Sequence, residues 1–372
     1  MTERILFYPE IVTFGGGERI LLGLSRHLHQ SGIAHRIVSY YQEIDLASHA
    51  DWPLTVETLS PSRHPLRKAR ALCAYLKRQR AAGAGAMLLT GIQSALHVGA
   101  FGADDYVLII LDTPSLLSTA QNAKRGPGAL KHAARERLTR LLTRRGMLRA
   151  RRIIGTSDYM AREMKTLYGV NALVARQGGF PPGAAFRPRA VAGGETVRLL
   201  SVSRLEENKR IDWIIESVRS PEFQSAMKDV ANWHLDIVGT GREEESLKSR
   251  VANSGLGVRV TFHGYVSDDR LEAIYGAAHL FVMPARQGYG LPALEALSRG
   301  LPVVMHEESG VSEILRGTPW VELMDGKSRP LAAALVRMIR RLKSGGLASE
   351  PLPAFPSESD WAREVCRICD WR

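Results

Sequence analysis

The chain has 372 residues, and its 50 lysines and arginines against 38 acidic residues give a formal net charge of +12. That length is too great for one ordinary domain and predicts two domains of about 180 residues each. Hydrophobic residues make up 45% of the chain, which is typical of a globular protein and excludes a disordered or fibrous one. We find no apolar run of the roughly eighteen residues that span a bilayer, and no signal peptide. The three cysteines fit a reducing compartment, so we expect a cytoplasmic protein.

Strand-like apolar runs alternate with helix-length amphipathic segments along the whole chain. Strands are expected at residues 5–8, 36–40, 86–90, 106–111, 152–155, 197–202, 234–239, 279–283 and 301–305. Because parallel strands need long, usually helical, crossovers, this alternation predicts an α/β protein with two doubly wound, Rossmann-like parallel sheets.

A stretch rich in proline and glycine interrupts this pattern at residues 178–195. We therefore predict an amino-terminal domain at 1–180, a linker at 181–195 and a carboxyl-terminal domain at 196–356. Residues 357–372 begin with cap-type residues and carry apolar residues at helical spacing, so they are predicted to form a terminal helix.

Two cations follow the strand predicted at 197–202. Arg204 lies at its carboxyl end, and Lys209 comes five residues later, where a helix is expected to start. Ligands of open α/β sheets bind at the carboxyl ends of the strands. The pair could neutralise a diphosphate, Arg204 through its fork and Lys209 as a point charge. The alternative is that both are solvated surface charges.

The segment 281–297 has the pattern of a strand, a glycine loop and a helix. Gly288 and Gly290 precede Pro292, and proline in the first turn marks a helix start. A helix amino terminus favours an anion such as a diphosphate, and Glu295 lies one turn inside the helix. An ordinary strand–turn–helix unit is the alternative.

Together these two segments resemble the retaining glycosyltransferases of family 4, which have the GT-B fold with a cleft between two domains. The resemblance is strongest between residues 197 and 313. It implies that the donor is held mainly by glycine loops and their neighbours, at Gly16, Gly17, Gly239, Gly264, Tyr265, Val266, Gly288, Tyr289, Gly290, Leu291 and Glu295. It also implies a terminal helix that crosses back to the first domain, whereas packing on the nearer domain is the alternative.

One position departs from the family pattern. The family carries two glutamates eight positions apart, and Gln287 stands at the first of them, with Glu295 at the second. Glutamine keeps the hydrogen-bonding capacity but loses the negative charge, which bears on rate or donor choice. We expect a working enzyme, with a catalytically silent partner subunit as the alternative.

A fourth catalytic candidate comes from the first domain, and no metal is expected. Asp112 follows the strand at 106–111 and could contact the donor sugar or the acceptor, or it could only cap a turn. Gln93 and His97 are weaker candidates on the acceptor side. The chain has no Asp-x-Asp motif, so Arg204 and Lys209 are expected to stabilise the leaving diphosphate without a metal.

The positive charge is concentrated in residues 62–80 and 131–152, where leucines are interleaved in the second segment at roughly helical spacing. A basic amphipathic helix is typical of a membrane-surface element. The alternative is a solvated face with a leucine stripe in the core. Nucleic-acid binding is disfavoured because only Tyr75 offers a stacking ring there.

From these observations the expected protein is a retaining glycosyltransferase that is peripheral on the cytosolic membrane face. It would move a hexose from a UDP- or GDP-sugar to a glycan acceptor in polysaccharide or glycolipid synthesis. We expect this acceptor to be polyprenyl-linked. A sugar-nucleotide epimerase, a silent partner subunit and a nucleic-acid-modifying transferase are the alternatives.

Overall fold

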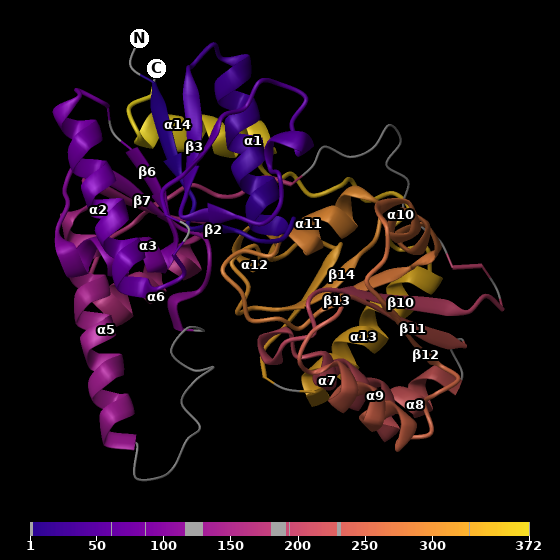
Figure 1. The fold of residues 1–372 in the computed structure, drawn as a ribbon. Coiled ribbons are helices and arrows are strands. Elements are labelled where there is room, and N and C mark those ends of the chain that lie inside the picture. The colour runs from indigo at the N-terminus through magenta and orange to yellow at the C-terminus, as the bar shows by residue number, and fades with distance from the viewer. Residues whose placement is uncertain are drawn as a thin grey trace. The chain divides into compact units, whose positions relative to one another are not determined.

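The computed structural model describes residues 3–60, 62–85, 87–115, 129–179, 191–192, 194–228, 232–326 and 328–371. Its contacts divide the chain into two compact units, Met1–Gly178 with Pro356–Arg372, and Gly179–Phe355 (Figure 1). Most of the predicted linker, residues 181–190 and 193, lies outside the described residues, so the linker boundaries remain a prediction.

The first unit contains a seven-stranded parallel sheet with the order β5-β3-β1-β6-β7-β8-β9. Its strands are β1 (Arg4–Phe7), β3 (His35–Ser39), β5 (Val56–Thr58), β6 (Met87–Thr90), β7 (Tyr106–Ile110), β8 (Arg152–Gly155) and β9 (Leu173–Val174). A separate parallel pair is formed by β2 (Glu10–Ile11) and β4 (Tyr41–Gln42). The strand order reverses between β1 and β6, the point at which open α/β sheets usually bind ligands.

Helices cover both faces of this sheet, because its strands carry apolar residues without interruption. Phe7 packs into the core on one face and Leu6 into the core on the other, as the period of two in a strand requires. One layer contains α2 (Pro65–Ala81), α3 (Gly91–Phe101) and α5 (Ala129–Arg149), and α1 (Gly16–Gln30) packs with the terminal helix α14 (Glu358–Ile368) in the other. The other helices among the described residues of this unit are a short 3₁₀ turn at Ala47–His49 and α6 (Asp158–Tyr168).

Two glycines bring α3 and α5 into close contact. A β-carbon at Gly99 would collide with the carbonyl of Leu142, and one at Gly146 would collide with the carbonyl of Ala95. The buried side of α5 therefore contains Gly146 and its neighbour Met147. This close approach fixes which face of α5 is turned inward.

The second unit contains a six-stranded parallel sheet with the order β12-β11-β10-β13-β14-β15, which reverses between β10 and β13. Its strands are β10 (Val197–Val202), β11 (Trp233–Val238), β12 (Val260–Gly264), β13 (Leu280–Met283), β14 (Val303–His306) and β15 (Val321–Met324). The helices are α7 (Ile211–Arg219), α8 (Pro221–Lys228), α9 (Glu244–Ala252), α10 (Asp268–Ala277), α11 (Leu291–Ser298), α12 (Ser312–Leu315) and α13 (Ser328–Lys343), with a 3₁₀ turn at Glu207–Lys209.

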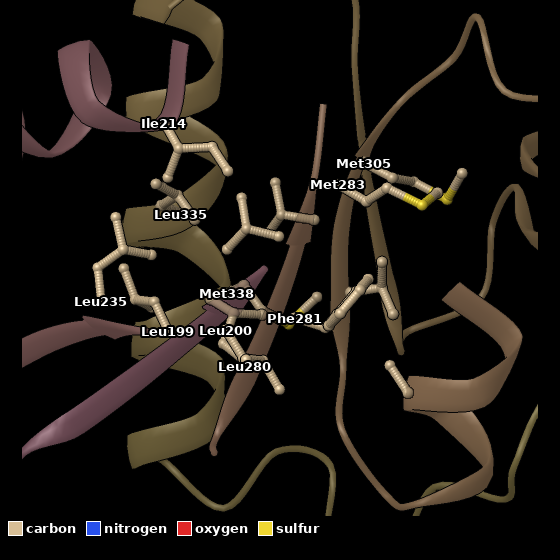
Figure 2. Close-up of a cluster of buried hydrophobic side chains, with 14 of the residues drawn as sticks. Leu199, Leu200, Ile214, Leu235, Leu280, Phe281, Met283, Met305, Leu335 and Met338 are labelled. Carbon is tan, nitrogen blue, oxygen red and sulfur yellow. The ribbon is translucent and has the colours of Figure 1, made fainter. Parts of the chain in front are cut away.

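One part of the core of this unit lies between its sheet and α13. Figure 2 shows Leu199 and Phe281 from the two central strands packed in one cluster with Leu335 and Met338 of α13. All four side chains are buried. At about 25 cal/mol per Å² of apolar surface removed from water, each contributes on the order of 2 kcal/mol. The core holds β10 and β13 side by side and so fixes where their carboxyl ends lie.

The predicted α/β class with two parallel sheets is confirmed. The strands at 152–155 and 197–202 match their predicted bounds, and the others agree to within one or two residues. One detail is wrong. Lys209 does not begin a helix but ends the 3₁₀ turn, and α7 begins two residues later at Ile211.

The basic segment 62–80 forms most of α2, but its charges are not all exposed. Lys68 is only 5% exposed and forms an ion pair with Glu10. Arg63 pairs with Glu43. The sequence contains no acid within this segment, yet the fold brings acids to it from β2 and from the loop after β4, so its surface charge is smaller than predicted.

The basic segment 131–152 forms most of α5, and its leucines do not build a core stripe. Leu138, Leu141 and Leu148 are each more than half exposed. The alternative of a leucine core stripe is therefore wrong for these three residues. Of the helices that the structure describes, none combines the length and apolar character required to span a bilayer.

Candidate donor-binding site

The candidate residues of the second unit lie on loops that follow neighbouring strands. Arg204 and Lys209 follow β10, and the segment from Pro284 to Gly290 follows β13. These two strands flank the point where the strand order reverses. A crevice forms at such a point because the two connections run to opposite faces of the sheet.

Lys209 and Gln287 are in direct contact. The Lys209 ammonium donates a hydrogen bond of 2.8 Å to Oε1 of Gln287. The amide nitrogen of Gln287 lies 2.9 Å from Sδ of Met283 and 3.5 Å from Oγ of Ser309. The carbonyl oxygen of Gln287 therefore binds the Lys209 ammonium. Met283 and Ser309 hold the orientation of the amide.

Backbone hydrogen bonds join the same two loops. The Arg286 N–H donates to the Asn208 carbonyl over 2.9 Å, and Nδ2 of Asn208 donates back to the Arg286 carbonyl over 3.2 Å.

Arg204 is exposed, and its side chain has no hydrogen bond or ion pair with another residue that the structure describes. Its five N–H donors are thus suited to an anionic ligand.

The glycine loop before α11 requires glycine for steric reasons. Gly290 has φ of +119°, and a β-carbon there would lie 2.5 Å from Oγ of Ser309. That hydroxyl donates to the Tyr289 carbonyl over 2.7 Å. Gly288 and Tyr289 are buried beside it. Leu291 begins α11, with Pro292 in its first turn as predicted, and Glu295 lies half-buried one turn further.

A second pair of glycines joins the ends of β11 and β12. The Gly239 N–H donates to the Gly264 carbonyl over 2.8 Å. Gly239 has φ of +126°, and a side chain there would collide with the Ser203 carbonyl, next to Arg204. Val266 packs partly against the core, whereas Tyr265 is 88% exposed. Gly239 thus lets the backbone lie close to the Ser203 carbonyl. The Tyr265 ring lies at the surface, next to Gly264 in the chain.

In the first unit, Gly16 and Gly17 begin α1 after the loop that follows β1. The Gly15 N–H donates to the Glu18 carboxylate over 3.0 Å, and a β-carbon at Gly17 would collide with the Tyr8 hydroxyl. Burial raises the pKa of Tyr8, and the Glu18 carboxylate and then Asp112 raise it further.

Asp112 is exposed directly after β7. The structure thus brings the Tyr8 hydroxyl, the Glu18 carboxylate and this candidate acid into one electrostatic neighbourhood. The sequence analysis did not single out Tyr8 or Glu18. The only feature of the sequence that could have indicated them is that Tyr8 precedes and Glu18 follows the glycine loop.

A second polar network in the first unit surrounds Glu10, which accepts hydrogen bonds from Lys68 and Gln93. Nearby, the Tyr40 hydroxyl lies 2.6 Å from Nδ1 of the buried His97. Burial lowers the pKa of His97 to about 4, and the positive charge of Lys68 adds to the shift. The imidazole is therefore neutral at neutral pH and shares a hydrogen bond with the Tyr40 hydroxyl.

No cluster of three or more His, Cys, Asp or Glu side chains suited to a metal ion occurs among the residues that the structure describes. Gly16, Gly17, Asp112 and the weaker candidates Gln93 and His97 belong to the first unit, and the other site candidates belong to the second. The structure brings Lys209 and Gln287 together, and it brings Gly239 next to the strand that delivers Arg204.

Comparison with known proteins agrees with this geometry. The family model for glycosyl transferases group 1 matches residues 196–341. The mannosylfructose-phosphate synthase of Agrobacterium fabrum is 35% identical over 131 residues, which are 32% of this chain and 27% of that protein. A GDP-mannose-dependent phosphatidylinositol monomannoside mannosyltransferase of Mycobacterium tuberculosis is 30% identical over 168 residues, 40% of this chain and 42% of that one. The matches thus span well under half of these relatives.

Solved structures share the fold over nearly the whole chain. The structure of Anabaena Alr3699/HepE in complex with UDP superposes with a TM-score of 0.66, at 16% identity and 99% coverage of both chains. The two parallel sheets and this similarity show that the chain has the GT-B fold. Within this fold, residues 196–341 match the glycosyl transferases group 1 family.

Proposed function

We propose that this protein transfers a hexose from a UDP- or GDP-sugar to a glycan acceptor with retention at the anomeric carbon. The observation that carries the proposal is the contact between Lys209 and Gln287 beside the reversal point of the second sheet. The family match of residues 196–341 supports it, and so do the UDP complex of one structural neighbour and the GDP-mannose named for one relative.

The charges of the site suit the departure of a nucleoside diphosphate. In the proposed reaction the bond between the anomeric carbon and the phosphate oxygen breaks, and the acceptor oxygen bonds to that carbon on the same face. The acceptor proton passes to the departing phosphate. Arg204 and Lys209 stabilise the diphosphate charge as it develops, so the residues supply this stabilisation without a metal ion. Gln287 binds hydroxyls of the sugar, and Glu295 the ribose.

The acceptor side is proposed for the first unit, with Asp112 as a candidate contact. For a polyprenyl-linked acceptor, the protein would have to work at a membrane surface. The exposed leucines of α5 among its arginines support such a contact, because they combine apolar anchors with cations that attract an anionic leaflet. Leu138, Leu141 and Leu148 lie on the side of the helix opposite to its buried face, which is formed by Thr143, Gly146 and Met147.

A panel of UDP- and GDP-sugars with a polyprenyl-lipid extract tests this proposal. Released nucleotide and labelled lipid are measured, with and without EDTA. Transfer from one donor that EDTA leaves unchanged is the expected result and would identify base and sugar together. Transfer that stops with EDTA would remove the metal-independent part of the proposal.

A catalytically silent partner subunit is the second candidate, and Gln287 is the observation that favours it, because the amide lacks the charge of the family's glutamate. Nucleotide binding without release from any donor would establish this alternative. Interconversion of the donor sugar without transfer would instead indicate an epimerase.

A further inference from the structure

Arg210 adopts a backbone conformation that is unusual for its residue type. Its φ is +54° and its ψ +40°, the left-handed region, at the residue between Lys209 and the start of α7. A β-carbon makes this region unfavourable, and glycine adopts it most easily. The turn therefore needs interactions of the arginine side chain to offset the backbone strain.

The side chain provides such interactions with two other loops. Its Nη2 donates to the Glu308 carboxylate over 2.5 Å, after β14, and Nη1 donates to the Pro284 carbonyl over 3.4 Å, after β13. The guanidinium also lies 4.3 Å from the ring centroid of Trp213 on α7. One half-buried group thus joins the loops that follow three neighbouring strands, β10, β13 and β14.

Glu308 is fixed in turn by its surroundings. Its backbone N–H donates to Nδ1 of His306 over 3.0 Å, and Trp213 packs against the edge of that imidazole. Burial alone would raise the pKa of Glu308, but the hydrogen bond and charge of Arg210 outweigh it and hold the pKa below its usual value. Arg286 adds a more distant positive charge 3.9 Å from the carboxylate.

The loops joined by Arg210 are those that carry the Lys209–Gln287 contact. The Gln287 N–H donates to the Glu308 carbonyl over 3.1 Å, and Gln287 also forms an isolated parallel bridge with Ser309. Lys209 precedes Arg210 directly in the chain. A displacement of the guanidinium would therefore affect both partners of the contact, although Arg210 touches neither side chain.

We propose that Arg210 is a positioning residue of the donor site, which orders the Lys209 turn and the Gln287 loop by clamping them through Pro284, Glu308 and Trp213. Its place in the reaction rests on the proposed function. The clamp itself is a property of the ligand-free protein. A nucleotide sugar would meet Lys209 and Gln287 already in place, which reduces the ordering that binding requires.

Arg210→Gly separates this role from a contribution to the fold. Glycine accepts the left-handed conformation without strain, so thermal unfolding should remain within a few degrees of the wild type while the clamp is lost. Glu308→Gln removes the ion pair from the other side without a backbone change. Arg250→Ala is the matched control, because Arg250 forms an exposed ion pair with Glu216 away from the site.

Hydrogen exchange of the ligand-free variants tests the clamp. The amides of Arg286 and Gln287, which donate to the Asn208 and Glu308 carbonyls, should exchange at least about tenfold faster in Arg210→Gly and Glu308→Gln. They should be unchanged in Arg250→Ala. Unchanged exchange in both site variants would overturn the clamp whatever the activity of the protein.

Sugar transfer tests its role. In both site variants kcat should fall about tenfold or more, since small displacements of reacting groups are costly in rate. The kcat of the double variant should equal that of the more impaired single variant, because both residues act through one ion pair. Wild-type kcat in Arg210→Gly with faster exchange would overturn the positioning role. Absence of both nucleotide binding and transfer in the wild type would overturn the proposed function, and the role with it, but not the clamp.

Discussion

The Lys209 ammonium and the Gln287 amide oxygen lie 2.8 Å apart on loops that follow different strands. In the family pattern the position of Gln287 is a glutamate, which would neutralise the lysine. Here the acceptor is neutral, so the positive charge of Lys209 is not cancelled by this partner. The proposed donor site therefore has one more positive charge than a glutamate would leave. This charge favours a diphosphate but gives less support to a developing positive charge on the sugar.

Arg204→Ala and Lys209→Ala should each reduce sugar transfer by about a hundredfold or more, because each removes a cation from the leaving diphosphate. The free energy of unfolding of Arg204→Ala should change by less than about 0.5 kcal/mol, since this side chain is exposed. Steady-state transfer and urea unfolding measure the two effects. Arg219→Ala, an exposed arginine at the end of α7, is the control. Wild-type activity in both variants would remove the diphosphate site.

Gln287→Glu should weaken the binding of a nucleoside diphosphate by roughly three- to tenfold, up to about 1.4 kcal/mol, because a carboxylate would partly neutralise Lys209. Its kcat should be retained or raised, since the carboxylate supports positive charge at the anomeric carbon. Titration calorimetry and turnover separate the two effects. The interpretation fails if Gln287→Glu binds more tightly and turns over more slowly. Gln287→Leu, which cannot accept a hydrogen bond from Lys209, should lose activity without gaining charge.

Substitution of Leu138, Leu141 and Leu148 by serine should weaken binding to anionic lipid vesicles by about tenfold or more, because an inserted leucine contributes on the order of 1.5–3 kcal/mol. Stability should change little, as these side chains are 57%, 57% and 56% exposed. Vesicle co-sedimentation at two salt concentrations measures the binding, which salt should weaken. Leu173→Ser, an exposed leucine on β9, is the control. Equal sedimentation of the triple variant and the wild type would contradict a membrane role for α5.

His97→Asn should reduce the pH dependence of stability in mildly acidic solution. The folded-state pKa of His97 is about 4, below the ordinary value near 6.5, so the unfolded chain takes up a proton that the folded protein does not. Stability from the neutral imidazole is thus fully present above pH 6.5 and is lost as the pH falls toward 4, by at most about 1.4 kcal/mol per unit.

Asparagine preserves an acceptor for the Tyr40 hydroxyl but does not titrate. Urea unfolding at pH 7, 6 and 5 should therefore give a shallower loss of unfolding free energy in the variant than in the wild type. Parallel curves for the two proteins would show that His97 is protonated in the folded state as easily as in the unfolded one.

The local elements and the class of fold could be derived from the sequence because they depend on neighbours in the chain. The apolar runs predict the strands, and Pro292 after Gly290 predicts the start of α11, since backbone preferences act over a few residues. The resemblance extended this to the candidate positions, including the departure at Gln287. None of this required knowledge of which strands lie side by side.

The tertiary structure decided which side chains meet. Arg210 and Glu308 are 98 residues apart in the chain, and they meet because the sheet order sets β10, β13 and β14 next to one another. Lys68 has no acid near it in the sequence, yet it is buried against Glu10. The exposed direction of Leu141 was fixed by the contact of Gly146 with α3. Helical spacing places such leucines on one stripe, but only the packing of the helix determines whether that stripe faces the core or the solvent.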